Sequence, residues 1–196
     1  MTDAADPPDA ADPADATGGR GPRQGRRRIV SIAIGVVVAV ALGVGLTVGT
    51  GGGPQNAPAF SLPRLGGGQP VSYPLTGAEA HRPVVLTFFA SWCPPCRAEL
   101  PMVARVARQE QAAGDGVVFL GVDGNDNPAS GLSFARQSGV SFVVGTNADS
   151  ALAPRFTLVG YPGTVFIDAT GKIVDTVHGP VSHTTLETYL TRLSHT

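Results

Sequence analysis

The distribution of apolar and polar residues predicts a membrane segment near the start of the chain. Residues 29–50, IVSIAIGVVVAVALGVGLTVGT, contain no charged residue. A helix of this length covers roughly 33 Å at 1.5 Å rise per residue, which is enough to cross the hydrocarbon core of a bilayer. A soluble helix of this length would show a polar stripe, and this segment has none. We therefore predict a transmembrane helix over residues 29–50.

Beyond residue 56, short apolar runs alternate with amphipathic stretches. The apolar run over 83–90 is typical of a strand buried on both faces of a mainly parallel sheet. The order β-α-β-α-β-α-β-β-α predicts an α/β fold. The expected elements are a hairpin over 57–73, strands over 83–90, 116–123 and 141–144, helices from Cys93 onward and over 129–138 and 148–156, a hairpin of strands 163–168 and 172–177, and a helix from Ser182 to Leu193.

The helix that follows strand 83–90 has one apolar face. Cys96 belongs to this face and should point to the core, whereas Cys93 precedes the first turn and is expected to present an exposed sulfur. The free amides and the positive dipole end of a helix start favour a thiolate at Cys93. Pro101 is expected to kink the helix one turn later. The apolar face consists of Cys96, Leu100, Val103 and Ala107.

Both cysteines of the 196-residue chain lie in the sequence Cys93-Pro94-Pro95-Cys96. Two thiols at this spacing can close a small disulfide ring, and prolines are tolerated in a first helical turn, whose amides lack intrahelical partners. Thiol–disulfide exchange needs one sulfur that attacks and a second that resolves the mixed disulfide. We predict that Cys93 is the attacking sulfur and Cys96 the resolving one.

The residues before the apolar segment predict its orientation. Residues 1–28 combine regularly spaced Asp with Ala and Pro, followed by five Arg, and are expected to be disordered because they cannot bury enough apolar surface. These Arg flank the N-terminal side of the segment, and the next charged residue after it is Arg64. The positive-inside rule then predicts a cytoplasmic N-terminus, with residues 51–196 outside the cytoplasm in an oxidising compartment.

The remaining boundaries follow from composition. Residues 51–56 read as a flexible linker, and the folded domain is expected over 57–196. A cleaved signal peptide is the alternative, because Ala57-Pro58-Ala59 has the small-x-small form of a cleavage site. The apolar run is longer than a signal-peptide core, which favours an uncleaved signal anchor.

Composition and spacing weigh against several other functions. With 14 basic and 15 acidic residues, the net charge of −1 gives no support for nucleic-acid binding. A structural zinc site needs four ligands, so we expect no metal and no cofactor. The chain has Ala90 three residues before Cys93, where a thiol peroxidase would carry threonine, and a copper chaperone of this kind would have three residues between its cysteines. Besides the two cysteines, only His81, His178, His183 and His195 could be zinc ligands, and these are expected at the surface.

Several motifs together resemble one protein family. Trp92-Cys-Pro-Pro-Cys-Arg-Ala-Glu-Leu-Pro101 opens the helix, Phe60-Ser61-Leu62 lies near the domain start, and an insert spans 125–138. With the later Gly160-Tyr-Pro-Gly-Thr164, these stretches resemble the membrane-anchored TlpA/ResA-like branch of the thioredoxin fold, over roughly residues 57–194. The resemblance implies a thioredoxin-like fold, with a central mixed sheet flanked by helices.

The resemblance also implies roles for individual residues. Pro162 would be a cis-proline opposite the disulfide, with the Tyr161 backbone pairing to an extended substrate and Trp92 forming a contact surface. Thr87 stands where thioredoxins carry a buried Asp. Glu99 matches the acidic residue of the TlpA/ResA-like branch and would exchange a proton with Cys96, although a solvated helix carboxylate is the alternative. No second acid or base is evident in the sequence around this site.

These observations predict an extracytoplasmic thiol–disulfide oxidoreductase acting on exported proteins. The resemblance suggests a reductant in cytochrome c maturation or a similar thiol pathway, with apocytochrome c as a client and a CcdA- or DsbD-type membrane electron donor. A disulfide-forming oxidase is the first alternative. A redox-inactive, membrane-held binding domain with a structural disulfide is the second, and it is disfavoured because so short a ring constrains the unfolded chain little.

Overall fold

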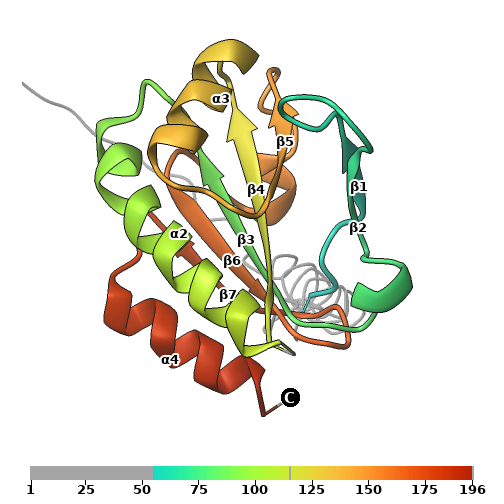
Figure 1. Cartoon of the computed structure of the whole chain (residues 1–196). Helices are drawn as coiled ribbons and strands as arrows, with labels where there is room; N and C mark the ends of the chain where they lie inside the picture. The colour runs from blue at the N-terminus through green and yellow to red at the C-terminus, as the bar shows by residue number, and fades with distance from the viewer. Residues whose placement is uncertain (1–54, 115, 196) are drawn as a thin grey trace, which may run out of the picture. The chain divides into compact units, whose positions relative to one another are not determined.

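The computed structural model describes residues 55–114 and 116–195. In the part of the chain that it describes, an α/β domain is built around one central sheet (Figure 1). Its elements are β1 Phe60–Leu62, β2 Val71–Tyr73, the 3-10 helix η1 Gly77–Glu79, β3 Val84–Phe89, α2 Pro94–Ala113, β4 Val118–Gly124, α3 Pro128–Gln137, β5 Val143–Asn147, the 3-10 helix η2 Ala153–Phe156, β6 Gly163–Ile167, β7 Ile173–His178 and α4 His183–Leu193.

The central sheet has the strand order β5-β4-β3-β6-β7. Strands β3, β4 and β5 are parallel to one another, whereas β6 is antiparallel to both β3 and β7. The mixed sheet implied by the family resemblance is therefore confirmed. Parallel β3 and β4 bring their carboxyl ends to the same edge of the sheet, and β3 leads into α2 at that edge.

Strand β3 is central because its residues are apolar on both faces. All six of its residues are buried, and the side chains alternate between two cores. Val85 and Phe89 belong to the core beneath α2, α3 and α4, whereas Val84 and Phe88 belong to the opposite core, which is closed by η2 and the β1–β2 hairpin. The near-continuous apolar run in the sequence correctly predicted this position.

The N-terminal hairpin covers one edge of the sheet, as expected. Strands β1 and β2 pair with each other, and the segment after β1 lies along β5. Leu65 N–H donates to the Val144 carbonyl at 2.8 Å, and Thr146 N–H donates to the Pro63 carbonyl at 2.8 Å. The outer edge of β5 is therefore partly paired.

Two predicted elements differ from the observed ones. The helix expected over 148–156 is only the 3-10 helix η2, since Ser150 has a positive φ of 57° and Pro154 lacks an N–H. The strand expected over 141–144 is shifted to β5, where pairing with β4 continues to Asn147. Pro101 lies inside helix α2, which continues to Ala113.

The predicted tail over 1–28, the predicted transmembrane helix over 29–50 and most of the predicted linker lie outside the described residues. Among residues 55–114 and 116–195, no helix combines the length and apolar character needed to cross a membrane. The linker's last two residues, Gln55 and Asn56, already pair with the domain. Ile173 N–H donates to the Gln55 carbonyl at 2.8 Å, and Asn56 forms an isolated antiparallel β-bridge with Lys172.

Candidate active site

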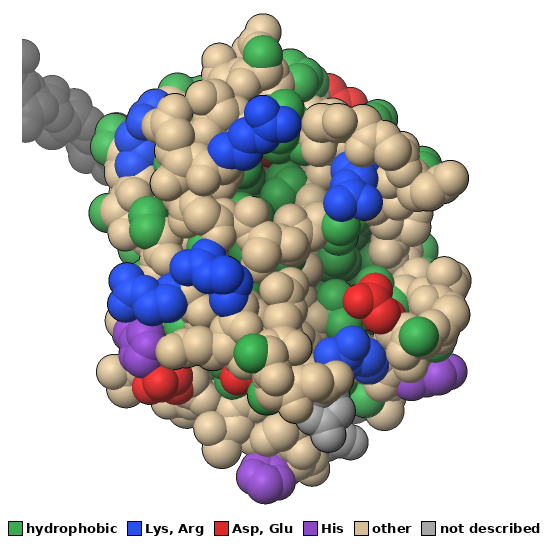
Figure 2. Space-filling model, in the orientation of Figure 1, with side chains coloured by type: hydrophobic (Ala, Val, Ile, Leu, Met, Phe, Trp, Pro, Cys, Tyr) green, Lys and Arg blue, Asp and Glu red, His purple; other side chains and the backbone are tan. Residues whose placement is uncertain are grey.

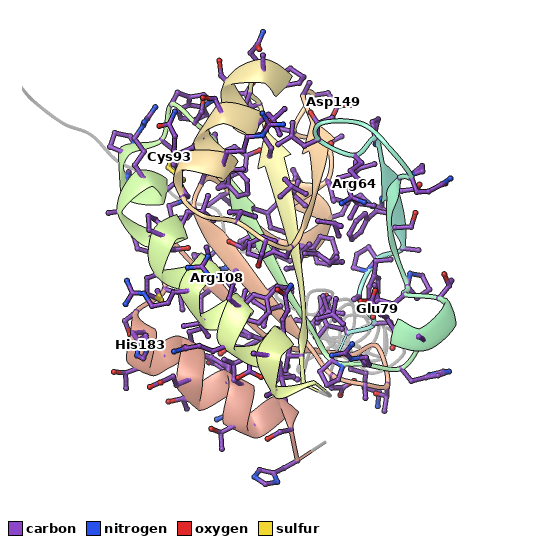
Figure 3. All side chains as sticks on the ribbon, in the orientation of Figure 1. Arg64, Glu79, Cys93, Arg108, Asp149 and His183 are labelled. Atoms are coloured by element: carbon purple, nitrogen blue, oxygen red, sulfur yellow. A yellow bond between two sulfur atoms is a disulfide. The ribbon has the colours of Figure 1, made fainter. Side chains whose placement is uncertain are left out.

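The two cysteines form a disulfide at the start of α2, at one end of the sheet (Figure 3). Their sulfurs are 2.12 Å apart and their Cα atoms 5.3 Å apart. Cys93 is the N-cap of the helix, and its Sγ accepts a hydrogen bond from Cys96 N–H at 3.2 Å. Pro94 and Pro95 have no N–H, so the Cys96 N–H is the first-turn amide that reaches this sulfur. A sulfur at the positive end of the helix dipole with an amide donor is stabilised as a thiolate.

Cys93 is not exposed, and the prediction of an exposed sulfur is wrong for the disulfide form. Only 2% of Cys93 and 1% of Cys96 is accessible to solvent. The bond to Cys96 and the capping contact fold the Cys93 side chain back over the first turn. The neighbouring residue Trp92 is 54% exposed instead. Capping geometry, rather than exposure, distinguishes the two sulfurs.

The structure brings Trp92 and Tyr161 together beside the disulfide. Their ring centroids are 6.1 Å apart in an edge-to-face arrangement. The Tyr161–Pro162 peptide bond is cis, as the family resemblance implied. Trp92 Nε1–H donates to the Asn125 carbonyl at 2.8 Å, and Tyr161 O–H donates to Ser150 Oγ at 3.0 Å. Both aromatic side chains are therefore fixed by hydrogen bonds at their polar ends.

Glu99 is buried on the inner side of α2, one helical turn beyond Cys96. It is 6% exposed, so the alternative of a solvated carboxylate is wrong. Its Oε2 accepts a hydrogen bond from Val181 N–H at 2.6 Å. Burial raises the pKa of Glu99 to about 7, and the Val181 hydrogen bond offsets part of that rise. A carboxyl with this pKa can take up or release a proton near neutral pH.

Thr87 lies at the middle of β3, directly opposite Thr164 on β6. Both side chains are buried, and neither hydroxyl has a hydrogen-bond partner. The position that carries an acid in thioredoxins is therefore occupied here by an uncharged side chain, as the sequence indicated.

Asp123 is a buried acid that the sequence reading missed. It is the last residue but one of β4 and pairs with Phe89 of β3, at the edge of the sheet where β3 leads into α2. Asp123 is 0% exposed, and neither of its carboxyl oxygens has a hydrogen-bond donor. Burial, together with the neighbouring Asp126, raises its pKa to about 8. The signal available in the sequence was an Asp near the carboxyl end of a strand that runs parallel to β3.

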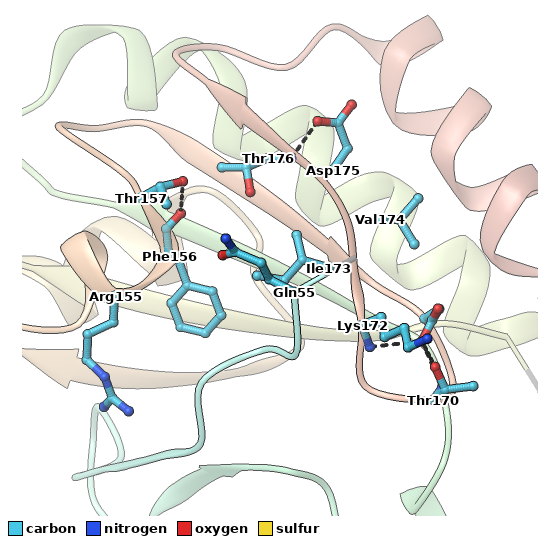
Figure 4. Close-up of a pocket in the computed structure, with 11 residues that line it drawn as sticks. Gln55, Arg155, Phe156, Thr157, Thr170, Lys172, Ile173, Val174, Asp175 and Thr176 are labelled. Atoms are coloured by element: carbon cyan, nitrogen blue, oxygen red, sulfur yellow. Dashed lines mark hydrogen bonds between the residues drawn. The ribbon is translucent and has the colours of Figure 1, made fainter. Parts of the chain in front are cut away.

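Other features of the domain lie apart from this site. The four histidines are exposed, and no group of three potential metal ligands occurs in the described part of the chain. A cavity of about 820 Å³ lies beside β7, lined by Lys172 and Asp168 among others, and none of its lining residues is a predicted site residue (Figure 4). Lys and Arg side chains are scattered over the face shown in Figure 2 rather than gathered into one basic patch.

Comparison with known proteins agrees with the redox geometry. Thiol:disulfide interchange protein HelX of Rhodobacter capsulatus is 28% identical over 131 residues, which cover 65% of this chain and 69% of HelX. Thiol-disulfide oxidoreductase ResA of Bacillus thuringiensis is 24% identical over 111 residues, covering 57% of this chain and 63% of ResA. The matches thus span about two thirds of each relative, and they confirm the predicted TlpA/ResA-like resemblance.

A solved structure shows the same fold. The structure of MTB dsbF in its mixed oxidized and reduced forms is 30% identical, with a TM-score of 0.60, and covers 68% of this chain and 94% of dsbF. The model of the AhpC/TSA family matches residues 54–176. Because this match spans well over half of the 196 residues, the chain belongs to the AhpC/TSA family.

Proposed function

We propose that this protein is a thiol–disulfide oxidoreductase that exchanges disulfides with other proteins through Cys93 and Cys96. The observation that carries the proposal is the disulfide at the N-cap of α2, with Cys93 Sγ accepting from Cys96 N–H. A capping sulfur is stabilised as a thiolate and is a good leaving group, which are the properties that exchange requires. The names of HelX, ResA and dsbF support this reaction class.

In the reductive direction, the Cys93 thiolate attacks one sulfur of a client disulfide. A Cys93–client bond forms, and the second client sulfur leaves as a thiolate. Cys96 then loses its proton and attacks Cys93 Sγ, which restores the Cys93–Cys96 bond and releases the first client sulfur as a thiolate. Two electrons pass from the enzyme to the client. In the oxidative direction the same steps run in reverse.

Glu99 is proposed to accept the Cys96 proton. It follows Cys96 by one helical turn and is shielded from solvent, and its pKa of about 7 lets it hold a proton in one half of the cycle and release it in the other. The Val181 N–H keeps the carboxyl in place. Thr87 cannot take this role, because its hydroxyl does not titrate in this range.

The client is proposed to bind beside Trp92. A pocket of about 290 Å³ opens between Trp92 and the loop that leads to Pro162, and Val159 in that loop is 95% exposed. Exposed apolar side chains next to a reactive centre favour an unfolded or extended client segment. We propose that the segment pairs with the Tyr161 backbone and contacts Trp92 and Pro162.

The proposed setting follows the sequence prediction. Residues 29–50 would anchor the chain, with the N-terminus in the cytoplasm and the catalytic domain outside it. In that compartment a reductant needs a membrane electron donor, proposed here to be of the CcdA or DsbD type, and cytochrome c maturation with apocytochrome c as client is the pathway we favour. A disulfide-forming oxidase is the alternative, and the two differ only in the direction of electron flow.

Reduction potential and covalent trapping test these proposals separately. A potential near or below about −250 mV against glutathione would support a reductant, and one above about −180 mV an oxidant. Cys96→Ala should accumulate mixed disulfides through Cys93, whereas Cys93→Ala, the matched control, should accumulate none. If the reduced Cys93 thiol shows no pKa below about 8 in an alkylation titration and Cys96→Ala traps no client, the oxidoreductase proposal is wrong.

A further inference from the structure

The turn after β4 holds the segment that leads into Cys93. Asp126 accepts two hydrogen bonds from Ser91, from its N–H to Oδ2 at 2.5 Å and from its Oγ–H to Oδ1 at 2.9 Å. Ser91 is buried and lies two residues before Cys93. The Asp126 side chain, 35 residues away in sequence, therefore fixes the backbone immediately ahead of the sulfur.

The same turn also fixes Trp92. Its indole N–H donates to the Asn125 carbonyl at 2.8 Å, next to Asp126 in the chain. Asp126 Oδ1 additionally accepts from Asn127 N–H at 2.7 Å, so the carboxyl is held to its own turn as well as to Ser91. Both residues ahead of Cys93 thus hydrogen-bond to one turn, and any displacement of Asp126 would reach them.

Asp123 stands near the end of β4, three residues before Asp126, and the Asp126 carboxyl is near enough to raise the pKa of Asp123. No solvent reaches Asp123, and no donor in the described residues reaches either of its oxygens. Two adjacent carboxylates, one of them fully buried, cannot both carry a charge without a large cost in free energy. Protonation of Asp123 removes this repulsion between the two carboxylates, because its O–H can then donate to an Asp126 oxygen.

Two residues that lie against Asp123 are uncharged. Helix α3 packs over it at Gly131, where a Cβ atom would lie 1.9 Å from Asp123 Oδ2. Thr146 of β5 pairs directly with it and has a buried hydroxyl without a partner. Tyr161 is a further titratable group near Asp123, and its pKa is raised by the charges of both Asp123 and Asp149.

We propose that Asp123 and Asp126 share one proton, and that this acid–carboxylate pair positions Ser91 and Trp92 ahead of Cys93. Both are positioning residues, since they act on the sulfur through the backbone of residues 91 and 92. The consequence for catalysis rests on the proposed exchange reaction, whereas the pair itself does not.

Loss of the shared proton should release the turn. Ionised Asp123 would repel Asp126, and the Ser91 hydrogen bonds would weaken as Asp126 moves away. Because the pKa of Asp123 is raised to about 8, this release should occur as the pH rises through about 8. Trp92 should become more mobile in the same range.

Trp92 is the only tryptophan in the chain, so intrinsic fluorescence reports this movement directly. The experiment uses the full-length oxidised chain between about pH 6 and 9, because disulfide-bonded cysteines do not titrate. We expect a change in emission with a midpoint near pH 8. Asp123→Asn, which keeps the shape and a donor to Asp126, should lose the transition. Asp126→Asn should lose it as well.

Two control variants separate the pair from nearby charges. Asp149→Asn makes the same substitution at an exposed carboxyl near the same end of the sheet (Figure 3), and it should keep the transition. Glu99→Gln removes the other buried acid and should also keep it. A transition that persists unchanged in Asp123→Asn, or that disappears in Glu99→Gln, would overturn the proposal, as would its absence from the wild-type chain.

A second measurement tests the effect on catalysis. Asp126→Asn should lower kcat/KM for reduction of a disulfide substrate such as insulin about tenfold, because the sulfur is no longer held in place. Asp149→Asn should leave it unchanged. An unaltered kcat/KM in Asp126→Asn would show that the pair does not position Cys93. A wild-type protein that exchanges no disulfide would refute the proposed function, while the fluorescence experiment would still decide the shared proton.

Discussion

Glu99 Oε2 accepts a hydrogen bond from the backbone N–H of Val181, 82 residues later in the chain, at 2.6 Å. The bond joins α2 to the segment that leads into α4. The Glu99 carboxyl is therefore held in place by a residue from the C-terminal part of the chain. A buried carboxylate with a single amide donor is only partly compensated for its lost hydration. This explains why its pKa rises although the hydrogen bond favours the charged form.

Replacing Glu99 with Gln should change how stability depends on pH. In the folded wild type the pKa of Glu99 is raised from 4.5 to about 7, so its stability contribution is complete below pH 4.5 and is lost as the pH rises to about 7. The free energy of unfolding should therefore fall by up to roughly 3 kcal/mol over this range relative to Glu99→Gln, at 1.36 kcal/mol per pKa unit. Denaturant titrations of both proteins at several pH values measure it. A difference that stays constant with pH would contradict the assignment.

The same variant should slow the resolving step. If Glu99 takes the proton of Cys96, the rate at which Cys96 releases a Cys93-linked client rises in the wild type as the pH passes about 7. Glu99→Gln should lack this rise and be slower by about 100-fold above it. Stopped-flow release of a fluorescent peptide from the mixed disulfide gives the rate. Glu187→Gln on α4, whose side chain is 60% exposed, is the matched control and should behave as wild type.

The sequence predicted the parts of the site that depend on local pattern. The apolar run of β3, the buried stripe of α2 and the N-cap position of Cys93 follow from side-chain periodicity and helix capping, which neighbouring residues decide. The cis bond before Pro162 came only from the family resemblance. The sequence identified Glu99 as a candidate proton acceptor but did not predict its burial or its hydrogen bond. Its partner Val181 is distant in sequence and adjacent only in the fold.

The burial of Asp123 could not be read from the sequence for a related reason. A turn such as Gly-Asn-Asp-Asn predicts exposed polar residues, and Asn125, Asp126 and Asn127 all make turn or capping hydrogen bonds. Whether Asp123 faces solvent depends on α3, which crosses over it at Gly131. The burial of Cys93 likewise depends on the disulfide, which folds its side chain over the helix start.

Replacing the two buried threonines with valine should stabilise the domain. Thr87 and Thr164 face each other across β3 and β6, and each buries a hydroxyl without a partner. Valine has the same shape without the polar group, so each substitution should raise the free energy of unfolding by about 1 kcal/mol. Thermal or denaturant unfolding of the single and double variants measures this. Thr176→Val on β7, which is only half-buried, should change it by less than about 0.5 kcal/mol. A loss of stability in Thr87→Val would mean that its hydroxyl is hydrogen-bonded to water.

Gly131→Ala should destabilise the protein, although alanine is the better helix former. At an exposed helix position this substitution should stabilise by about 1 kcal/mol. At Gly131 the new Cβ would lie 1.9 Å from Asp123 Oδ2, so the carboxyl or α3 has to move. We expect a net loss of about 1–3 kcal/mol, as for other overpacked cores.

A double variant shows whether that loss comes from Asp123. Asp123→Ala removes the carboxyl that the new methyl group would meet, so Gly131→Ala should be tolerated in this background and recover its helix preference. The coupling free energy from the four unfolding measurements should therefore be favourable and exceed about 1 kcal/mol. Gly160→Ala, where an added Cβ meets no atom within 4 Å, is the matched control and should show no coupling to Asp123→Ala. Additive effects of Gly131→Ala and Asp123→Ala would mean that α3 does not confine the Asp123 carboxyl. Packing against α3 would then not explain why Asp123 lies near Asp126.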